Sequence, residues 1–395
     1  MGDVRLILLI TGLLLLAGIV LNKPSKRFGI PGLLLYLGLG MAIGNGGKYD
    51  FLYNYPQLTL HFSQVAIGLI VFIGGLETRI ERFKPIIKEG ISLSTLGVLV
   101  CSVVTGLFGW FVFRLEWLEA WLLGAIISST DAAAVFSILN ANKLKLKNHL
   151  AELLEFESGT NDPMAWFLTL SLTSLLTGHS VGFWNIVFDF FAGIAIGLIL
   201  GLGFGRLGIY ISRNLKLDIK GLYPLILLSI ALVVMGASSL LYGNMLLAMY
   251  VSGIVLGNTK LPFQSYSINF FESISWLLEI SLFIILGLEV FPKQMLPYLF
   301  PAVLMAVFLM FVARPLSVWV SLTPFGRSNP DKLYVSWVGL RGATPIVFSL
   351  IPLTAGVGNS EVIFNSVFVI VIFSVILQGT GVVWMARLLK RVDDH

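Results

Sequence analysis

Long apolar runs recur along the whole chain, from residue 4 to residue 386. A helix needs about 17–25 mostly apolar residues to cross the hydrocarbon core of a bilayer. Only 12% of the residues are charged, whereas soluble domains carry roughly 25%. The sequence therefore predicts an all-α polytopic membrane protein whose first partner is the membrane lipid bilayer.

Loop signals between the apolar runs divide the chain into thirteen predicted transmembrane helices. They cover residues 4–21, 29–46, 60–77, 91–113, 117–139, 150–177, 181–209, 219–240, 243–258, 268–291, 297–320, 332–352 and 361–386. Polar residues interrupt the sixth and twelfth spans, so hydropathy alone supports these two least. Residues 6–21 resemble a signal-peptide core, but no small-residue cleavage site follows, and we expect an uncleaved first span.

The basic residues alternate between the two ends of the predicted spans. With the N-terminus outside, twenty Lys and Arg residues fall in cytoplasmic segments and four in outside segments. This asymmetry predicts an outside N-terminus and a cytoplasmic C-terminus. The pI of 9.2 is explained by these loops, so we expect no nucleic-acid partner. The last two basic residues, Arg314 and Arg341, lie within spans.

Three short stretches recur in order at an offset of 212 or 213 residues. FIGGLE at 72–77 returns as IILGLE at 284–289, VFSI at 135–138 as VFSL at 347–350, and GMAIGN at 40–45 as GIVLGN at 253–258. The offset equals seven spans, and an odd shift inverts the second copy in the membrane. Inverted repeats are typical of secondary transporters.

We therefore predict two inverted six-helix repeats joined by helix 7. The predicted units are residues 1–177, the linking span at 178–215, residues 216–390, and a short cytoplasmic tail at 391–395.

Helix-breaking or polar residues interrupt two spans that are repeat mates. SSTDAAAVFSI places Asp131 at mid-depth in the fifth span, and RGATPIVFSL in the twelfth carries Arg341, Gly342 and Pro345. Proline removes a backbone hydrogen bond, and glycine tolerates non-helical backbone. Irregular backbone at this depth is viable only where it lines a protein cavity or is buried.

We predict that helices 5 and 12 are broken and cross, with positive helix ends near Asp131 and negative ends near Arg341. A continuous kinked helix is the alternative.

The stretch ESGTND at 157–162 places polar groups in the sixth span. Ser158 and Asp162 are four residues apart and share a helix face, and the depth of Asp162 matches that of Asp131. Carboxylate, hydroxyl and carbonyl oxygens suit a hard cation, and Asn161 adds an amide oxygen without a second charge. We predict a monovalent-cation site here; a structural N-cap at Asp162 for a half-helix beginning at Pro163 is the alternative.

Competition between ions supplies the predicted chemistry. Desolvation favours the neutral form of a carboxyl group, so the group holds either a proton or a cation. Trading one proton for one monovalent cation moves no net charge, and no cofactor is needed. A cation-coupled symporter and a cation channel are the alternatives, although a channel needs a continuous pore. No GxGD motif of intramembrane aspartyl proteases precedes Asp131, so we expect a transporter and not an enzyme, with no catalytic residues.

Glu157 needs a basic partner, because an unpaired buried charge is strongly destabilising. We predict an ion pair with Arg341 or with Arg314, which would hold the sixth span against the second half of the chain.

Three further acids lie in or at the ends of spans. Glu77 ends the third span and is either a cation-funnel residue or an interfacial acid, while its repeat mate Glu289 is expected to be interfacial. Glu279 lies within the tenth span, and Arg314 is its candidate partner.

The stretches STDAAAVFSIL, ESGTNDPMA and WVGLRGATPI resemble the NhaP-type antiporters of the monovalent cation:proton antiporter superfamily, most closely the bacterial potassium/proton branch. The resemblance covers essentially the whole chain. It implies a thirteen-span NhaA/NapA-like fold and a homodimer whose core domain moves in an elevator-like fashion against a dimerisation domain. It also implies exchange of K⁺ or Na⁺ for H⁺, serving pH homeostasis, in a bacterial inner membrane.

The resemblance also implies roles for individual residues. Those of the ion and proton site would be Asp162, Asp131, Ser158, Thr130 and Asn161. Asp162 would carry the ion or proton, Thr130 would offer its backbone carbonyl, and Asn161 would position Asp162. Glu157 and Arg341 would be structural partners.

Two features depart from the potassium-type pattern. Such relatives tend to have an acid before the paired glycines of the third span, where this chain has Ile73 and places Glu77 after them. They also often carry a cytosolic regulatory domain, whereas this chain ends shortly after the last span, so we expect either no such domain or a shortened chain.

Overall fold

The computed structural model describes residues 4–28, 32–45, 53–178 and 182–393. Every named element in these ranges is a helix, and the β-type pairing there is a single bridge between Leu146 and Val392. The predicted all-α fold is confirmed. Seven helices or helix groups within these ranges are long and apolar enough to cross a membrane: Pro56–Glu77, Ile87–Phe113, Trp184–Asn214, Leu222–Leu240, Gln264–Glu289, Pro292–Phe325 and Ser360–Leu388.

The first seven predicted spans each correspond to one helix or to consecutive helices. They are α1 (Val4–Phe28), α2 (Gly32–Ile43), α3 (Pro56–Glu77), α5 and α6 (Ile87–Ser92 and Val98–Phe113), α7 and α8 (Trp117–Ile126 and Ala132–Ala141), α9 (Leu150–Leu176) and α10 (Phe183–Asn214). A short α4 (Ile80–Phe83) follows α3, and a π-helical segment, Leu93–Gly97, joins α5 to α6. Residues 29–31, 46 and 181 of the predicted spans lie outside the described residues.

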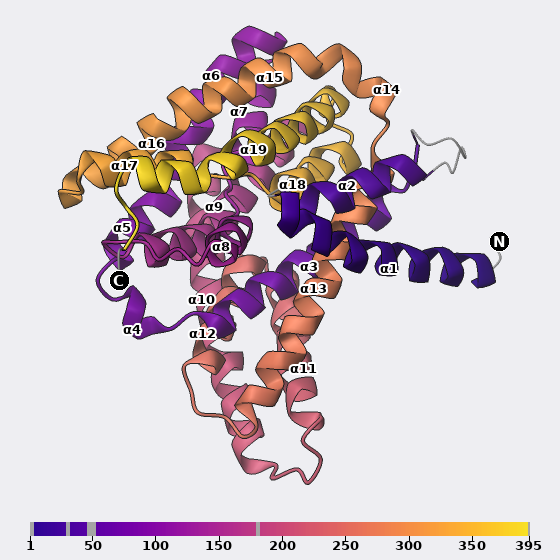
Figure 1. Cartoon of the computed structure of the whole chain (residues 1–395), viewed down its shortest axis with the longest axis vertical. Coiled ribbons are helices and arrows are strands. Elements are labelled where there is room, and N and C mark those ends of the chain that lie inside the picture. The colour runs from indigo at the N-terminus through magenta and orange to yellow at the C-terminus, as the bar shows by residue number, and fades with distance from the viewer. Residues whose placement is uncertain (1–3, 29–31, 46–52, 179–181, 394–395) are drawn as a thin grey trace.

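The last six predicted spans are also helical. They are α11 (Leu222–Leu240), α12 (Met245–Gly257), α13 (Gln264–Glu289), α14 to α16 (Pro292–Met295, Leu299–Phe308 and Arg314–Leu322), α17 and α18 (Asn329–Trp337 and Ala343–Thr354) and α19 (Ser360–Leu388). A second π-helical segment, Leu309–Ala313, lies between α15 and α16. Helix α1 begins and α19 ends on opposite sides of the molecule, as an odd number of spans requires (Figure 1).

Two predicted spans are broken at mid-length, as the sequence indicated. The fifth span is interrupted between α7 and α8 at residues 127–131, and the twelfth between α17 and α18 at residues 338–342. Pro345 lies in the first turn of α18, where a missing amide proton breaks no helical hydrogen bond. The alternative of continuous kinked helices is therefore wrong.

The internal sequence repeat corresponds to two equivalent helix–helix crossings in the structure. Helix α2 packs on α13, and α12 packs on α3. A side-chain carbon on Gly40 would lie 2.9 Å from the Cα of Gly287, and one on Gly253 would lie 3.0 Å from the Cα of Gly75. Gly40 and Gly253 are repeat mates, as are Gly75 and Gly287. In both crossings, a helix of one half of the sequence packs on a helix of the other half. The boundaries of the repeat units stay a prediction.

Two groups of helices frame the molecule (Figure 1). We call α1–α3 and α10–α13 the scaffold helices, because α3 packs on α12, α2 on α13 and α10 on both α11 and α12. We call α5–α9 and α15–α19 the site helices, among which α7 packs on α6 and α9, and α19 on α15 and α18. Each group draws helices from both halves of the sequence.

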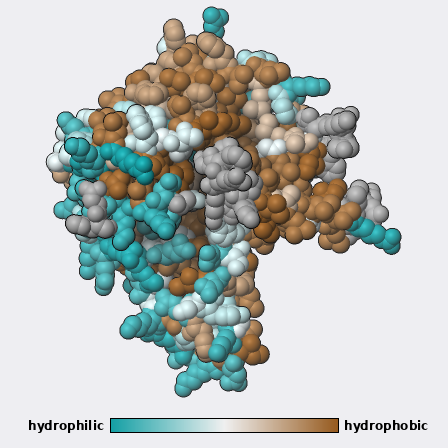
Figure 2. Space-filling view, in the orientation of Figure 1, coloured by the Kyte–Doolittle hydropathy of each residue, from teal (hydrophilic) through white to brown (hydrophobic). Residues whose placement is uncertain are grey.

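The surface divides into apolar and polar regions. Apolar residues cover the upper and right-hand parts of the view, and hydrophilic residues gather on the left, around α4, α5 and α17, and at the lower end (Figure 2). Exposed apolar side chains include Leu13 and Leu16 of α1, Phe188 of α10 and Phe300 of α15. A surface of this kind is expected where lipid replaces water as the solvent.

Candidate cation site

The two interrupted spans cross each other at their unwound segments. The backbone amide of Asp131 donates to the carbonyl of Leu340 over 2.8 Å, and this bond joins the two breaks. Gly342 lies directly against the carboxylate of Asp131, since a side-chain carbon there would lie 2.7 Å from Cγ of Asp131. The missing side chain of Gly342 thus allows the two segments to cross.

The ends of the half-helices face opposite charges, as predicted. Asp131 immediately precedes α8, and its carboxylate accepts a long hydrogen bond of 3.4 Å from the amide of Ala134. The buried guanidinium of Arg341 donates to the carbonyls of Ser128 and Ser129, at 3.1 and 2.6 Å, just past the end of α7. Helix N-termini favour anions and C-termini favour cations, so this arrangement neutralises the broken ends.

Asp162 lies in the middle of α9, beside the crossing. One carboxylate oxygen accepts a hydrogen bond from the hydroxyl of Ser129, and the other accepts one from Thr344 over 3.3 Å. Helix α9 runs without interruption through Pro163. The alternative of Asp162 as an N-cap is therefore wrong, and its carboxylate faces the two unwound segments.

Thr130 connects the crossing to α9 through both its oxygens. Its backbone carbonyl accepts from the hydroxyl of Ser158 over 3.0 Å, and its own hydroxyl accepts from the amide of Asn161 over 2.5 Å. The amide oxygen of Asn161 is fully buried and has no protein hydrogen-bond partner among the described residues. The structure thus brings together Asp162, Thr130, Ser158 and Asn161, with Asp131 on the adjoining break.

Glu157 pairs with Arg314 and not with Arg341. Two nitrogens of Arg314 donate to the two carboxylate oxygens of Glu157, at 2.5 and 2.8 Å. Arg341 instead binds the backbone carbonyls at the end of α7. Since Arg314 is engaged by Glu157, the predicted Glu279–Arg314 pair is wrong.

A cavity of about 430 Å³ separates the site helices from the scaffold helices and reaches Asp162. Among the described residues, its lining includes five acids and no basic side chain; the acids are Glu77, Asp131, Glu155, Asp162 and Glu279. It extends to Glu77 at the end of α3, next to α4, which Arg79 precedes and which contains Arg82. Glu77 therefore belongs to the cavity wall, as expected of a funnel residue.

Sequence reasoning left Ser129, Thr344 and Glu155 unassigned, although the first two contact Asp162 and Glu155 lines the cavity. Glu155 precedes Ser158 by three residues and Asp162 by seven, so the helical period already placed it on their face. No such signal existed for Ser129 and Thr344, because their contacts with Asp162 depend on the crossing of two unwound segments.

Glu289 is not an interfacial acid. Its side chain is buried and accepts a hydrogen bond of 2.8 Å from the hydroxyl of Thr59. Thr59 in turn contacts the hydroxyl of Tyr53 over 3.1 Å. The prediction missed this because Glu289 ends its helix, whereas in the fold α13 packs against α2 and α3.

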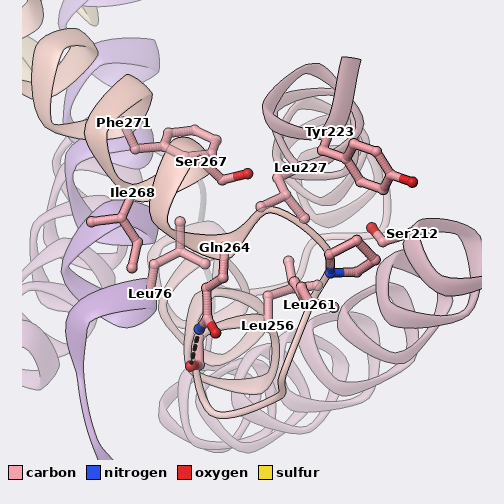
Figure 3. Close-up of a pocket in the computed structure, with 12 residues that line it drawn as sticks. Leu76, Ser212, Tyr223, Leu227, Leu256, Leu261, Gln264, Ser267, Ile268 and Phe271 are labelled. Carbon is pink, nitrogen blue, oxygen red and sulfur yellow. Dashed lines mark hydrogen bonds between the residues drawn. The ribbon is translucent and has the colours of Figure 1, made fainter. Parts of the chain in front are cut away.

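A second, much smaller pocket of about 20 Å³ lies among α10 to α13 (Figure 3). Leucine, isoleucine and phenylalanine side chains dominate its lining, and Gln264 donates to the carbonyl of Gly257 over 3.3 Å. The described residues of its lining include no carboxylate, so the larger cavity is the candidate site.

Comparison with known proteins places the chain in a family. Residues 11–388 match the model of the transmembrane sodium/hydrogen exchanger family. The chain belongs to the sodium/hydrogen exchanger family. It is 40% identical over 390 residues to a protein named K(+)/H(+) antiporter NhaP from Alkalimonas amylolytica, which covers 99% of this chain and 68% of that protein. It is 37% identical over 387 residues to K(+)/H(+) antiporter NhaP2 from a Shewanella species, which covers 97% of this chain and 67% of that protein.

Solved structures of a sodium proton antiporter share the fold. The sodium proton antiporter MjNhaP1 from Methanocaldococcus jannaschii superposes with a TM-score of 0.82 at 24% identity, covering 95% of this chain and 99% of that chain. This likeness shows that the chain shares the fold of that antiporter. The chain spans about two thirds of the length of the NhaP relatives it matches.

Proposed function

We propose that this chain is an antiporter that exchanges one K⁺ or Na⁺ for one H⁺ at Asp162. The observation that carries the proposal is a buried carboxylate that a cavity reaches and that neutral hydroxyls bond, with no basic side chain among the described residues of the cavity lining. Without a fixed positive charge, Asp162 must bind a proton or a mobile cation. The K(+)/H(+) antiporter name of a relative with 40% identity supports this assignment.

Competition for one carboxylate explains the coupling. The cation would be held by Asp162, the carbonyl of Thr130, Asp131 and the hydroxyl of Ser158, ligands that suit a hard cation. The unpartnered amide oxygen of Asn161 is a further acceptor in the same place. A proton on Asp162 removes its charge and displaces the cation, so each cycle exchanges one charge for another and is electroneutral. No cofactor takes part.

Alternating access requires the site helices to move against the scaffold helices. The cavity lies between the two groups and extends to Glu77, at the end that the loop charges assign to the cytoplasm. The structure thus corresponds to an inward-facing state in our proposal. The chain would lie in the bacterial inner membrane with its N-terminus outside. It would form a homodimer through scaffold helices, for which the exposed leucines of α1 are suited.

Reconstituted proteoliposomes with an internal pH dye test the proposal. K⁺, Na⁺, Li⁺ and Rb⁺ gradients are applied in turn, with and without an imposed membrane potential. We expect proton movement that depends on the cation gradient and is indifferent to the potential. Asp162→Asn should abolish it in a folded protein, whereas Asp189→Asn, at an exposed position of α10, should leave it unchanged. Exchange at the normal rate by Asp162→Asn would reject the proposal.

A further inference from the structure

Asn244, the N-cap of α12, links a scaffold helix to the helix that carries Asp162. Its side-chain amide donates a hydrogen bond of 2.8 Å to the backbone carbonyl of Pro163. Pro163 directly follows Asp162 in α9, which is a site helix, whereas α12 is a scaffold helix. The bond therefore crosses the boundary between the two helix groups, next to the residue that would carry the ion or proton.

The scaffold holds Asn244 on its other sides. Its backbone amide donates to the carbonyl of Gly193 in α10 over 2.9 Å, and its side-chain oxygen accepts from the amide of Leu247 over 3.0 Å, which caps α12. A side-chain carbon on Gly197, also in α10, would lie 2.9 Å from the carbonyl oxygen of Asn244. Asn244 is thus part of the scaffold, and its side chain has little freedom to follow a movement of α9.

A second residue of α12 contacts α9 one turn before Pro163. A side-chain carbon on Gly159 would lie 2.8 Å from Cε2 of Tyr250, so the tyrosine ring packs directly on the backbone of α9. The hydroxyl of Tyr250 lies 3.3 Å from the hydroxyl of Thr78, which follows the scaffold helix α3. The contacts of α12 therefore flank Asp162 in the sequence of α9, with the packed ring on one side and the hydrogen bond on the other.

The bond to Pro163 distinguishes the present state from any state in which the site helices have moved. The hydroxyls of Ser129 and Thr344, which bond Asp162, belong to the two broken spans and would travel with the site helices. Asn244 would stay with the scaffold. A hydrogen bond is lost when its two heavy atoms separate by about 1 Å beyond their normal distance, so even a small displacement of α9 against α12 breaks this bond.

We infer that Asn244 is a positioning residue whose side-chain amide holds α9 against the scaffold in the cytoplasm-facing state and releases Pro163 in every transport cycle. This inference rests on the proposed function. An interaction made in one state alone stabilises that state, so its loss shifts the protein toward the other state. The KM on each face rises as the fraction of protein open to that face falls. Loss of the bond therefore raises the ratio of the cytoplasmic KM to the outer KM for the cation.

Asn244→Ser removes the bond and keeps the helix cap. Serine caps a helix about as well as asparagine, but its side chain is too short to reach Pro163. Everted membrane vesicles present the cytoplasmic face to added K⁺ or Na⁺, and right-side-out vesicles present the outer face. We expect the ratio of the cytoplasmic KM to the outer KM to rise by about 3- to 10-fold, which corresponds to the net contribution of one hydrogen bond. Asn244→Thr, which also keeps a capping hydroxyl, should raise the ratio in the same direction.

Asn214→Ser is the matched control. The side-chain amide of Asn214 also donates a hydrogen bond of 2.8 Å to a backbone carbonyl, that of Tyr210, but both residues lie in α10. Because this bond lies within one scaffold helix, its loss should leave the KM ratio unchanged. Thermal unfolding in detergent shows whether each variant is folded.

The outcomes separate the inference from the function on which it rests. A wild-type protein without cation-dependent proton movement defeats the proposed function itself. If the wild type exchanges normally, a KM ratio that stays unchanged or falls in the Asn244 variants overturns the positioning role. So does the same rise of the ratio in Asn214→Ser. Failure of both Asn244 variants to fold also overturns it, because Asn244 would then serve the stability of the fold alone.

Discussion

The guanidinium of Arg314 and the carboxylate of Glu157 form a buried pair with two hydrogen bonds, of 2.5 and 2.8 Å. The pair joins the first turn of α16 to α9, one residue before Ser158 and five before Asp162. It therefore fixes the helix that carries the candidate ion ligands against the second half of the chain. Its role is positional, since neither side chain lines the cavity.

Removal of one partner should destabilise the protein strongly. We expect Arg314→Met to lower the free energy of unfolding by about 3–5 kcal/mol, because it leaves the Glu157 carboxylate buried without a countercharge. The double change Glu157→Leu with Arg314→Met should be milder than either single change. Thermal unfolding in detergent measures both.

Arg206→Met at an exposed position of α10 is the control, and should change stability by less than about 0.5 kcal/mol. Additive losses in the double variant would mean that the two side chains are not energetically coupled.

The sequence alone could not decide whether Arg314 or Arg341 pairs with Glu157. Both arginines lie within predicted spans, but the direction in which each side chain points depends on the local backbone. A π-helical segment, Leu309–Ala313, immediately precedes Arg314, and its extra residue per turn rotates the following residues. No pattern in the sequence predicted this π-helical segment.

Features that depend on short sequence patterns were predictable. Apolar run lengths defined the thirteen spans, and glycine and proline at mid-depth marked the broken helices. The offset of the repeats identified which helices correspond. Contacts made across the fold were not predictable in this way, and the bond from Thr344 to Asp162 depends on the exact path of an unwound segment.

The crossing of the unwound segments should tolerate no side chain at Gly342. We expect Gly342→Ala to reduce exchange at least about tenfold and to destabilise by about 1–3 kcal/mol, because the added carbon overlaps the Asp131 carboxylate. Transport in proteoliposomes and thermal unfolding measure the two effects. Gly236→Ala on α11, where a side chain meets nothing within 4 Å, is the control. Normal transport by Gly342→Ala would contradict this, because it would show that the two unwound segments can move apart without loss of transport activity.

The two equivalent helix crossings should respond alike to the same change. Gly40→Ala and its repeat mate Gly253→Ala each place a carbon against the backbone of the partner helix, so we expect similar losses of about 1–3 kcal/mol. Gly38→Ala, two residues before Gly40 and facing open space, should be neutral or stabilising, since alanine favours helix by about 1 kcal/mol. Thermal unfolding of the three variants decides. A large loss in one mate and none in the other would contradict the equivalence of the crossings.

Competition at Asp162 predicts how cation affinity changes with pH. If a proton and a cation exclude each other at one carboxylate, the proton acts as a competitive inhibitor of cation binding. Below the midpoint of proton binding, each unit of falling pH should raise the cation KM by about tenfold, while the maximal rate at saturating cation stays constant. Above that midpoint the carboxylate is already free, so the KM should level off. Initial rates in proteoliposomes with equal pH on both sides, measured over a series of pH values, provide the test. A maximal rate that falls at constant KM would contradict this prediction, because it would place the proton on a group separate from the cation. In that case Asn161→Asp, which adds a second acid beside Asp162, should leave the pH profile unchanged.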